Sequence, residues 1–472
     1  MASEGMGPDN TPIVTLDKTL ADFYNEENKN TGDRVVIVAS YPHGLRVEDQ
    51  RYVYHDEDRE SDVELSDGLT EAEGENASET MRALGAQKFS FCVGDMPLVI
   101  FDPANGRADR VTAFRTSVSA NLAILSSSQQ PKLRFFASPS LVVLNDKTFK
   151  LAPRLPMDGM DRLPHILHPD IHYELLSKRG LAIATFLTPR SHLLDLNIDA
   201  PQSESAIFRD PIKTWKDEVL QTISNRPIPF VLKLQQTILG KGTYIIKTEK
   251  ARCSLVSKLP SLMSSNASRT NKTNNHLMPA TLIITDFVDC PETGSPSFAI
   301  TFFVRRNGTH IFINCCEQIL SEHYSWDGSS ITFSQQDEFE KHFSKTVSDV
   351  SRYLQSKGYY GCVGIDVLED KEGKQWVVDM NVRPPGSLVL GLVKGFLSTE
   401  RGFDEASLLS SVRINGTKQE FLKKFSKEFA EGHLIMTACY HDTDHDVSWI
   451  SLIVGGKTKE DIRSLTARLT AF

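Results

Sequence analysis

Short apolar runs bounded by turn-forming residues recur over the first third of the chain. The run 34–40 (RVVIVAS) lacks alternating polar positions, which predicts a strand buried on both faces, as in a mainly parallel sheet. Similar runs predict strands at 89–93, 97–101 and 133–136, and helical spacing predicts a helix at 109–126. We therefore expect a small α/β domain over 32–144, after a polar leader over 1–31.

The pattern changes from residue 145 onward to helix and then mixed sheet. Asn145 is placed to cap a helix, and segment 251–280, rich in Ser, Asn, Thr and Lys, is expected to be a surface loop. The other predicted elements are strands at 180–189, 229–234, 282–288, 298–305, 310–316 and 449–454, and helices at 213–224, 337–357 and from about 458. We expect a second domain over 145–472, with a C-terminal part over about 396–472.

Two further apolar runs, 361–368 and 375–383, flank a charged turn and predict a hairpin with polar groups on one face. In a strand, alternate side chains share a face, so Asp379, Asn381 and Arg383 lie together, and Asp366 stands alone among apolar residues of the partner strand. A buried carboxylate needs a compensating cation or donor. Two carboxylates and an amide oxygen are ligands that suit Mg²⁺, and Arg383 adds a forked cation. The alternative is a solvated hairpin rim in which Arg383 pairs with one carboxylate.

Composition limits the class of protein. At 472 residues, 40% hydrophobic and 24% charged, the chain should form two or three units around separate cores. Its apolar runs fall short of the roughly 18 residues of a membrane helix, and the polar, acidic start lacks the features of a secretory signal. We expect a cytoplasmic protein with no membrane partner. The seven cysteines, without CxxC spacing, are interpreted as reduced core residues.

Negative charge is concentrated in one segment. The net charge is −9, but segment 48–80 alone holds thirteen Asp or Glu against Arg51 and Arg59. Such a density of like charge predicts a solvated insertion, with a patch that binds a partner protein as the alternative. The chain has no basic stripe with interleaved aromatic residues, so a nucleic-acid partner is not expected.

A lysine and a glycine loop carry the signal for phosphate chemistry. Lys233 ends an apolar strand, and Gly240, Lys241, Gly242 and Thr243 follow between two strands. Glycine lets backbone amides approach phosphate oxygens closely, although a plain hairpin turn also explains this loop. The spacing is neither that of a P-loop nor that of a dinucleotide fingerprint.

Taken in order, these pieces resemble the ATP-grasp superfamily over about residues 145–392. The matching elements are Asn145-Asp-Lys, 180–189, Phe230-Val-Leu-Lys-Leu, Gly240-Lys-Gly-Thr, Leu282-Ile-Ile-Thr-Asp-Phe-Val, Gly364-Ile-Asp-Val and Asp379-Met-Asn-Val-Arg-Pro. The resemblance implies an ATP-grasp fold, α/β and α+β in class, in which a nucleotide lies between two α+β subdomains, with a lid over about 225–288 and a preceding pre-ATP-grasp domain. Asp at 366 and 379, where many members have Glu, and few loop glycines are departures.

The resemblance also implies residue roles. Lys147 and Lys233 match the lysines that touch the ATP phosphates, and 240–243 matches the flexible loop over them. The other implied contacts are of three kinds. Asp286, Phe287, Val288 and Glu292 are implied to contact adenine and ribose. Asp366, Asp379 and Asn381 are implied to bind Mg²⁺, and Arg383 and Arg305 to contact the reacting groups.

The implied reaction is ADP-forming. A small carboxylate, by default an amino acid, becomes an acyl phosphate at the expense of ATP, and an amine then displaces phosphate to form an amide. ATP and Mg²⁺, with Mn²⁺ as the alternative ion, are the implied cofactors. The oligomeric state stays open, with a homodimer as the form that is common among similar enzymes. Two alternatives stay open: a bicarbonate-activating carboxylase of the same superfamily, and a non-catalytic ATP-binding scaffold protein.

Overall fold

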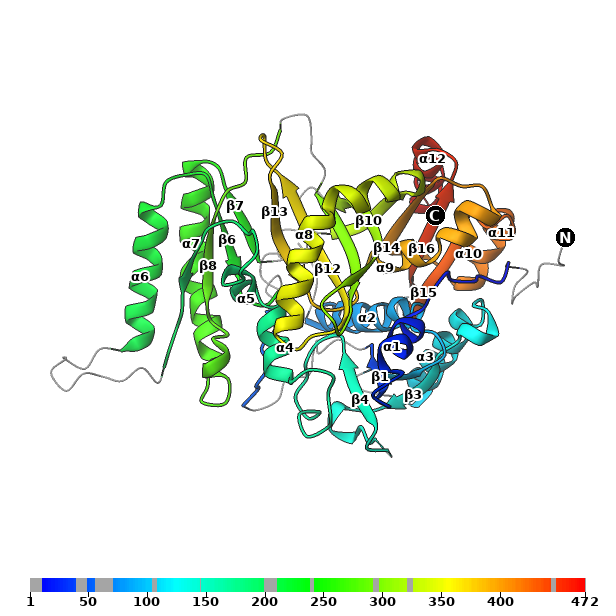
Figure 1. The fold of residues 1–472 in the computed structure, drawn as a ribbon, viewed down its shortest axis with the longest axis horizontal. Helices are drawn as coiled ribbons and strands as arrows, with labels where there is room; N and C mark the ends of the chain where they lie inside the picture. The colour runs from blue at the N-terminus through cyan, green and yellow to red at the C-terminus, as the bar shows by residue number, and fades with distance from the viewer. Residues whose placement is uncertain are drawn as a thin grey trace.

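The computed structural model describes residues 11–39, 49–55, 71–103, 108–144, 146–198, 210–237, 242–291, 297–320, 326–442 and 447–471. Within these residues the chain forms a four-stranded parallel sheet, an eight-stranded antiparallel sheet and a four-stranded antiparallel sheet, each with helices beside it (Figure 1). The mixed α/β class expected from the sequence is confirmed.

The parallel sheet has the order β3-β2-β1-β4. Its strands are β1 (Arg34–Val38), β2 (Pro97–Phe101), β3 (Lys132–Phe136) and β4 (Phe149–Pro153), and its helices are α1 (Leu20–Asn28), α2 (Glu71–Ser90) and α3 (Ala108–Leu122). Three predicted strands and α3 are confirmed. The predicted strand at 89–93 is wrong because α2 continues to Ser90. Of the acidic segment 48–80, residues 48 and 56–70 lie outside the described residues.

Strand β4 stands where a helix was predicted. Residues 149–153 pair in parallel with β1, so the parallel sheet extends past the expected boundary at residue 144. Asp146 accepts a hydrogen bond from the backbone N–H of Thr148 at 2.8 Å, which closes a turn before the strand. Asx side chains cap helices and close turns through the same kind of hydrogen bond, which is why the sequence signal was ambiguous. Asn145 itself lies outside the described residues.

The eight-stranded sheet has the order β13-β12-β9-β10-β11-β14-β16-β15. Its strands are β9 (Phe298–Val304), β10 (His310–Leu320), β11 (Trp326–Thr332), β12 (Gly361–Glu369), β13 (Gln375–Asn381), β14 (Glu405–Asn415), β15 (Leu434–Asp442) and β16 (Val447–Gly456). Helix α8 (Gln336–Ser356) covers one face through Phe343, Val347 and Val350, which are buried. The sequence prediction missed β11, β14 and β15.

The smaller antiparallel sheet, called the lid sheet here, has the order β5-β8-β6-β7. Its strands are β5 (Ser191–Leu194), β6 (Phe230–Leu234), β7 (Thr243–Ile246) and β8 (Leu282–Asp286), and helices α6 (Pro211–Asn225) and α7 (Glu249–Ser268) pack on one face. Helix α7 replaces the loop predicted at 251–280. Leu255, Leu259 and Met263, four residues apart, are its buried stripe, and its serines face solvent, whereas Asn266 is buried.

The short remaining helices complete the layers. They are α4 (Pro169–Leu176), α5 (Lys178–Ala182), α9 (Leu388–Leu392), α10 (Lys418–Lys424), α11 (Ser426–Ala430) and α12 (Lys459–Thr470). Helix α12 begins as predicted, with a capping box at Thr458. The strand predicted at 180–189 is wrong: α5 occupies its first residues. None of the helices in the described ranges combines the length and apolar character that crossing a membrane requires.

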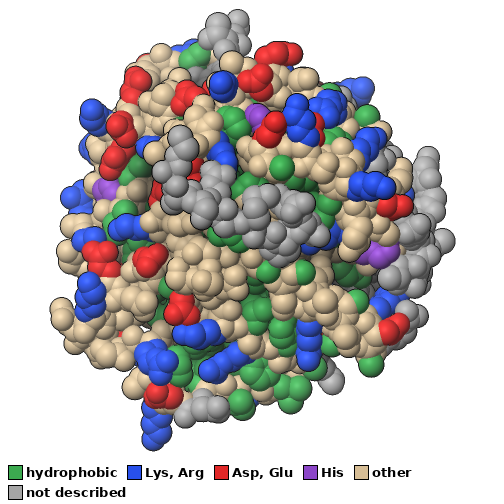
Figure 2. Space-filling model, turned by 90° about the vertical axis from the view of Figure 1, so that its right-hand side faces the viewer, with side chains coloured by type: hydrophobic (Ala, Val, Ile, Leu, Met, Phe, Trp, Pro, Cys, Tyr) green, Lys and Arg blue, Asp and Glu red, His purple; other side chains and the backbone are tan. Residues whose placement is uncertain are grey.

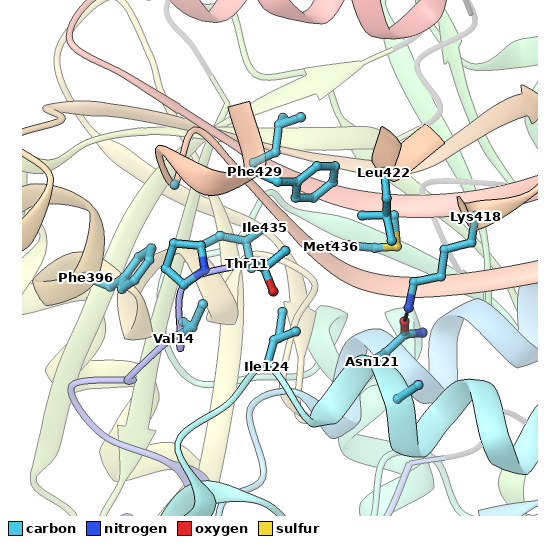
Figure 3. Close-up of a pocket in the computed structure, with 14 residues that line it drawn as sticks. Thr11, Val14, Asn121, Ile124, Phe396, Lys418, Leu422, Phe429, Ile435 and Met436 are labelled. Atoms are coloured by element: carbon cyan, nitrogen blue, oxygen red, sulfur yellow. Dashed lines mark hydrogen bonds between the residues drawn. The ribbon is translucent and has the colours of Figure 1, made fainter. Parts of the chain in front are cut away.

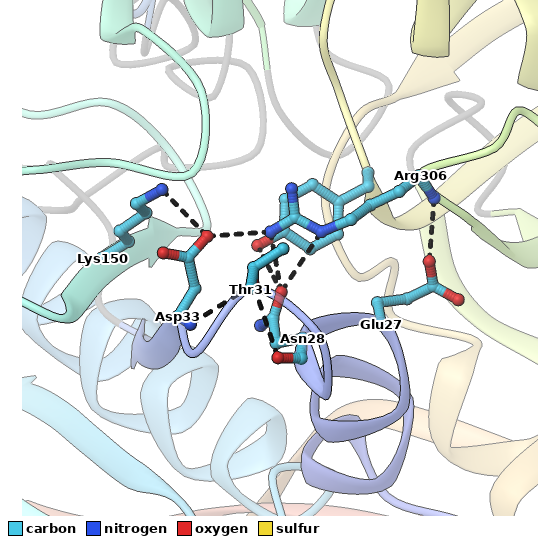
Figure 4. A network of polar contacts seen from close by, with 7 residues as sticks. Glu27, Asn28, Thr31, Asp33, Lys150 and Arg306 are labelled. Atoms are coloured by element: carbon cyan, nitrogen blue, oxygen red, sulfur yellow. Dashed lines mark hydrogen bonds and ion pairs between the residues drawn. The ribbon is translucent and has the colours of Figure 1, made fainter.

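A polar network joins the parallel-sheet unit to the eight-stranded sheet (Figure 4). Arg306, just after β9, donates to Asn28 Oδ1 at 2.7 Å and pairs with Asp33 at 3.1 Å, and Lys150 meets the same Asp33 oxygen at 2.9 Å. The guanidinium also lies 3.8 Å from the ring centroid of Tyr360. Arg306 therefore fixes α1 and the start of β1 against the end of β9, and its positive charge is paired within this junction.

The N-terminal segment also contacts the C-terminal elements. Val14, Ile124, Phe396 and Met436 help to line a small, mostly apolar cavity, beside which Lys418 donates to Asn121 Oδ1 at 2.7 Å (Figure 3). On the face that Figure 2 shows, positive and negative side chains are interspersed.

Candidate functional site

The hairpin β12–β13 places its polar side chains in register. Asp366 lies directly opposite Asp379, and Gly364 lies opposite Asn381. Asn381 Nδ2 donates to Asp379 Oδ2 at 3.2 Å, and Arg383 Nη2 donates to Asn381 Oδ1 at 2.7 Å. The expected grouping of two carboxylates, an amide and an arginine is therefore present in the structure.

A β-bulge on β13 adjusts this face. Val367 pairs with Val377 and Asp366 with Asp379, so Val378 has no partner residue on β12. Its carbonyl oxygen accepts a hydrogen bond from Lys233 Nζ at 2.6 Å. Lys233 lies on β6, so this contact joins the lid sheet to the hairpin.

A second lysine, which the sequence prediction missed, completes the cluster. Lys178 Nζ donates to Asp379 Oδ1, and the lysine side chain is only 12% exposed. Lys178 is the first residue of α5, where Ser177 Oγ accepts from the N–H of Gly180 at 2.8 Å and caps the helix. A Cβ on residue 180 would lie 2.0 Å from the carbonyl oxygen of Glu174, so only glycine allows this tight turn.

The sequence did contain a signal for α5. Ser177 followed by Lys, Arg and Gly is a helix-start pattern, but the apolar run after it was interpreted as a strand. The neighbouring Arg179 pairs with Asp195 at 3.0 Å, just beyond β5. Helix α5 is thus attached to the lid sheet through Arg179, while Lys178 contacts the hairpin.

The charged groups of this cluster, Asp366, Asp379, Lys178 and Lys233, influence one another's pKa values. Burial, and then the nearby Asp379, raise the pKa of Asp366 well above its usual range. Burial alone would raise the pKa of Asp379 as well, but Lys178 and Lys233 hold it below its usual range. Burial, and then Lys178, lower the pKa of Lys233 to about 8. Gln318 on β10 hydrogen-bonds Asp366 and is a further polar group that sequence reasoning missed.

The inner face of the lid sheet offers an apolar surface beside these charges. Val231 and Lys233 share the face of β6 that is turned away from α6 and α7, and Ile245 and Thr285 lie opposite Val231 on the neighbouring strands. Thr243, predicted to contact phosphate, lies opposite Lys233 on this face. The surface suits a flat aromatic base, with its phosphates toward the lysines.

The loop before β7 is described only from Gly242. This glycine has φ +65°, and a Cβ on it would lie 2.6 Å from Thr237 Cγ2, so both conformation and space require glycine. Gly240, Lys241 and Glu292 lie outside the described residues.

Lys147, Arg305 and Asp286 were predicted to belong to the site, but they lie away from the cluster. Lys147 is exposed in the turn before β4. Arg305 pairs with Glu26 at 2.8 Å, beyond the end of β9 where Val304 lies opposite Gly361. Gly361 is five residues from Asp366, or about 17 Å along the strand, so Arg305 lies at the far end of the sheet from the carboxylates.

Asp286 also points elsewhere. It lies opposite Phe230, whose side chain packs toward α6 and α7, and it pairs with Arg226 on that outer side. Arg190 and His192 line the same outer pocket. The predicted neighbours Phe287 and Val288 follow β8 and are half-buried, and Lys247 Nζ lies 5.0 Å from the Phe287 ring centroid.

The donor set fits a divalent cation that phosphate oxygens also bind. Asp366 and Asp379 are adjacent carboxylates whose mutual repulsion a cation would relieve, and Asn381 adds an amide oxygen. In the described part of the chain, no three His, Cys, Asp or Glu side chains gather into a metal cluster. Mg²⁺ is commonly held in this way, by one or two carboxylates together with substrate phosphates and water.

No family model and no curated protein matches the chain. Among solved structures, it is similar to N5-carboxyaminoimidazole synthetase from Staphylococcus aureus complexed with ADP, at 11% identity and TM-score 0.48, covering 93% of this chain and 97% of that one. It is also similar to L-amino acid ligase from Bacillus licheniformis, at 11% identity and TM-score 0.45, covering 93% and 96%. Phosphoribosylglycinamide synthetase from Anaerococcus prevotii gives 10% identity and TM-score 0.40, covering 93% and 97%. Identities and scores this low do not assign a reaction to the chain.

Proposed function

We propose that the protein is an ATP-grasp ligase that phosphorylates a small carboxylate and couples it to an amine. The observation that carries the proposal is the meeting of Asp366 and Asp379, directly opposite each other, with Lys178 and Lys233 from two other elements. Paired carboxylates with converging lysines, beside an apolar sheet face, form a place for a metal-bound triphosphate and its base. The order of the sequence motifs supports the same assignment.

Each residue has a role in this proposal. Lys178 and Lys233 neutralise the phosphate oxygens, and Asp366, Asp379 and Asn381 would hold Mg²⁺ or Mn²⁺. The bound ion would screen the charge that builds up on the phosphate oxygens during transfer. Arg383, which donates to Asn381 Oδ1, would bind the transferred group.

The reaction balances without any group beyond ATP and the two substrates. A carboxylate oxygen attacks the γ-phosphorus, the bond to ADP breaks, and an acyl phosphate forms. The amine nitrogen then attacks the acyl carbon, phosphate leaves, and the nitrogen gives up a proton. The chain's own contribution is to hold these groups in line and to shield the intermediate from water between the lid sheet and the hairpin.

The test is ADP release from ATP and Mg²⁺ with a panel of L-amino acids, added singly and in pairs. A second arm adds hydroxylamine, which converts an acyl phosphate to a hydroxamate without the natural amine. Stimulated ADP release together with a hydroxamate supports the ligase. Release stimulated by bicarbonate alone would instead favour a carboxylase, and ATP binding without any stimulated release would favour a scaffold protein.

Two variants of one hairpin make the test specific. Asp379→Asn should abolish turnover, because it removes a carboxylate from the metal set and leaves Lys178 without its partner. Glu372→Gln makes the same chemical change in the exposed turn of that hairpin and should keep turnover. Activity that survives Asp379→Asn would refute the metal assignment.

A further inference from the structure

A second cluster of positive charge lies on the same face of the eight-stranded sheet as the hairpin site. Lys88, at the end of α2, donates through Nζ to Ser410 Oγ at 2.7 Å and to the Ser410 carbonyl oxygen at 3.1 Å. Ser410 is two residues from Leu408, which lies opposite Ser329, and Ser329 lies opposite Gln318, the residue that bonds Asp366. These strand pairs place Leu408 and Asp366 on one sheet face, and Phe89 of α2, next to Lys88, packs in the same core cluster as Leu408.

Lys88 is held in a cationic setting. Arg154, only 6% exposed at the end of β4, is the charged group that acts on Lys88, and it lowers the lysine's pKa in addition to the effect of burial, to about 7. None of the described residues offers Lys88 a carboxylate partner, and Ser410 accepts only two of the three hydrogens that an ammonium group carries. A charged lysine in such a place lacks an anion.

An aromatic wall connects this cluster to the hairpin site. The Lys88 ammonium lies 5.9 Å from the ring centroid of Trp326, whose Nε1 donates to Ser329 Oγ at 3.2 Å. The far edge of the ring reaches the segment after Arg383: a Cβ on Gly386 would lie 2.5 Å from Trp326 Cη2. One indole ring therefore separates Lys88 from the chain segment that carries Arg383.

We infer that Lys88 binds a second anionic group of the substrate, so that the acid activated at the hairpin is a compound with two anionic groups. The inference rests on the proposed ligase function and specifies its substrate class: an acid with a further carboxylate or phosphate. The anion would accept the third Lys88 hydrogen, and the Trp326 ring would line the path between the two ends.

The test compares pairs that differ in negative charge: the isosteric pairs L-aspartate with L-asparagine and L-glutamate with L-glutamine, and O-phospho-L-serine with L-serine. Binding to the folded state raises Tm, so the Tm of the full chain with each compound, at matched ionic strength, reports binding without turnover. We expect at least one anionic member to raise Tm above its neutral partner. Lys88→Met should remove that difference, and Lys88→Arg, which keeps the charge, should retain it. A larger difference in Tm within the phosphoserine pair than within the other two pairs would identify the second anionic group as a phosphate, and the reverse would identify it as a carboxylate.

ADP release from the wild type separates this inference from the proposed function. A charge-dependent Tm shift without ADP release would refute the ligase and keep the anion site. Equal Tm shifts within every pair, no shift with any compound, or a difference that survives Lys88→Met would refute the anion site whether or not ADP is released.

Discussion

Replacing Lys233 by methionine should make the protein more stable near neutral pH while it weakens ATP binding. The folded structure lowers the pKa of Lys233 from 10.5 to about 8, chiefly through burial and then through Lys178. A shift of this size corresponds to about 3 kcal/mol of unfavourable free energy for holding the charged form at pH 7. Losing the hydrogen bond to the Val378 carbonyl offsets about 1 kcal/mol, so we expect a net gain of about 2 kcal/mol.

The pH dependence gives this prediction its sign. Between about pH 8 and pH 10.5 the unfolded chain holds a proton on Lys233 that the folded chain has released, so wild-type stability rises with pH relative to the variant. The gap is therefore full below pH 8 and closes as the pH approaches 10.5. The neighbouring charges that set this balance are Lys178, Asp366 and Asp379.

Urea unfolding at about pH 7 and about pH 10, followed by tryptophan fluorescence, measures the gap. Trp215 lies in the lid-sheet core, where its Nε1 donates to the Leu194 carbonyl oxygen of β5, and reports on this unit. Lys250→Met, on the exposed first turn of α7, is the matched control and should change stability by less than about 0.5 kcal/mol. A Lys233→Met variant that is less stable than wild type at pH 7, or a gap that does not narrow at high pH, would refute the reasoning.

Three further outcomes are expected. Lys178→Met should lower kcat for ADP release by about 10²-fold or more, because it removes a cation next to the transferred phosphate, and an unchanged kcat would count against its role. Asp366→Asn should abolish turnover, yet raise the free energy of unfolding when EDTA removes metal ions. The pKa of Asp366 in the folded protein lies above its ordinary value of 3.8, so the wild type loses stability as the pH rises from 3.8 to the folded pKa. The stability gained by the variant, measured by urea unfolding, must therefore grow with pH over this interval. Arg305→Gln should leave ADP-release kinetics within about twofold of wild type, because its partner Glu26 lies beyond the far end of the strands, and a large loss would return Arg305 to the site.

The parts of the site that lie on one strand or one hairpin could be predicted from the sequence. Strand alternation alone placed Asp379 and Asn381 on one face, because that relation depends on local geometry, whereas the register that sets Asp366 opposite Asp379 required the structure. Lys178 could not be found in this way. Its contact with Asp379 joins residues 201 positions apart, with the whole lid sheet between them in sequence, and exists only because α5 docks on the hairpin.

The errors in secondary structure have a common physical origin. Composition suggested a loop where α7 forms, since its many solvent-facing serines obscured the buried stripe of Leu255, Leu259 and Met263. Asp146 closes a turn with the chemistry of a helix cap, and β4 was therefore missed. In each case tertiary packing decided between local structures that the residues alone allow almost equally.

The bulge at Val378 has a consequence for how this site tolerates sequence change. The lid sheet meets the hairpin there through a main-chain oxygen, which every residue type supplies equally. Substitutions at position 378 can therefore accumulate without loosening the contact, provided that they suit a strand. Deleting the residue would restore a regular ladder and withdraw the oxygen from Lys233. Natural selection at this position should therefore act on the number of residues in the strand and hardly on the residue type.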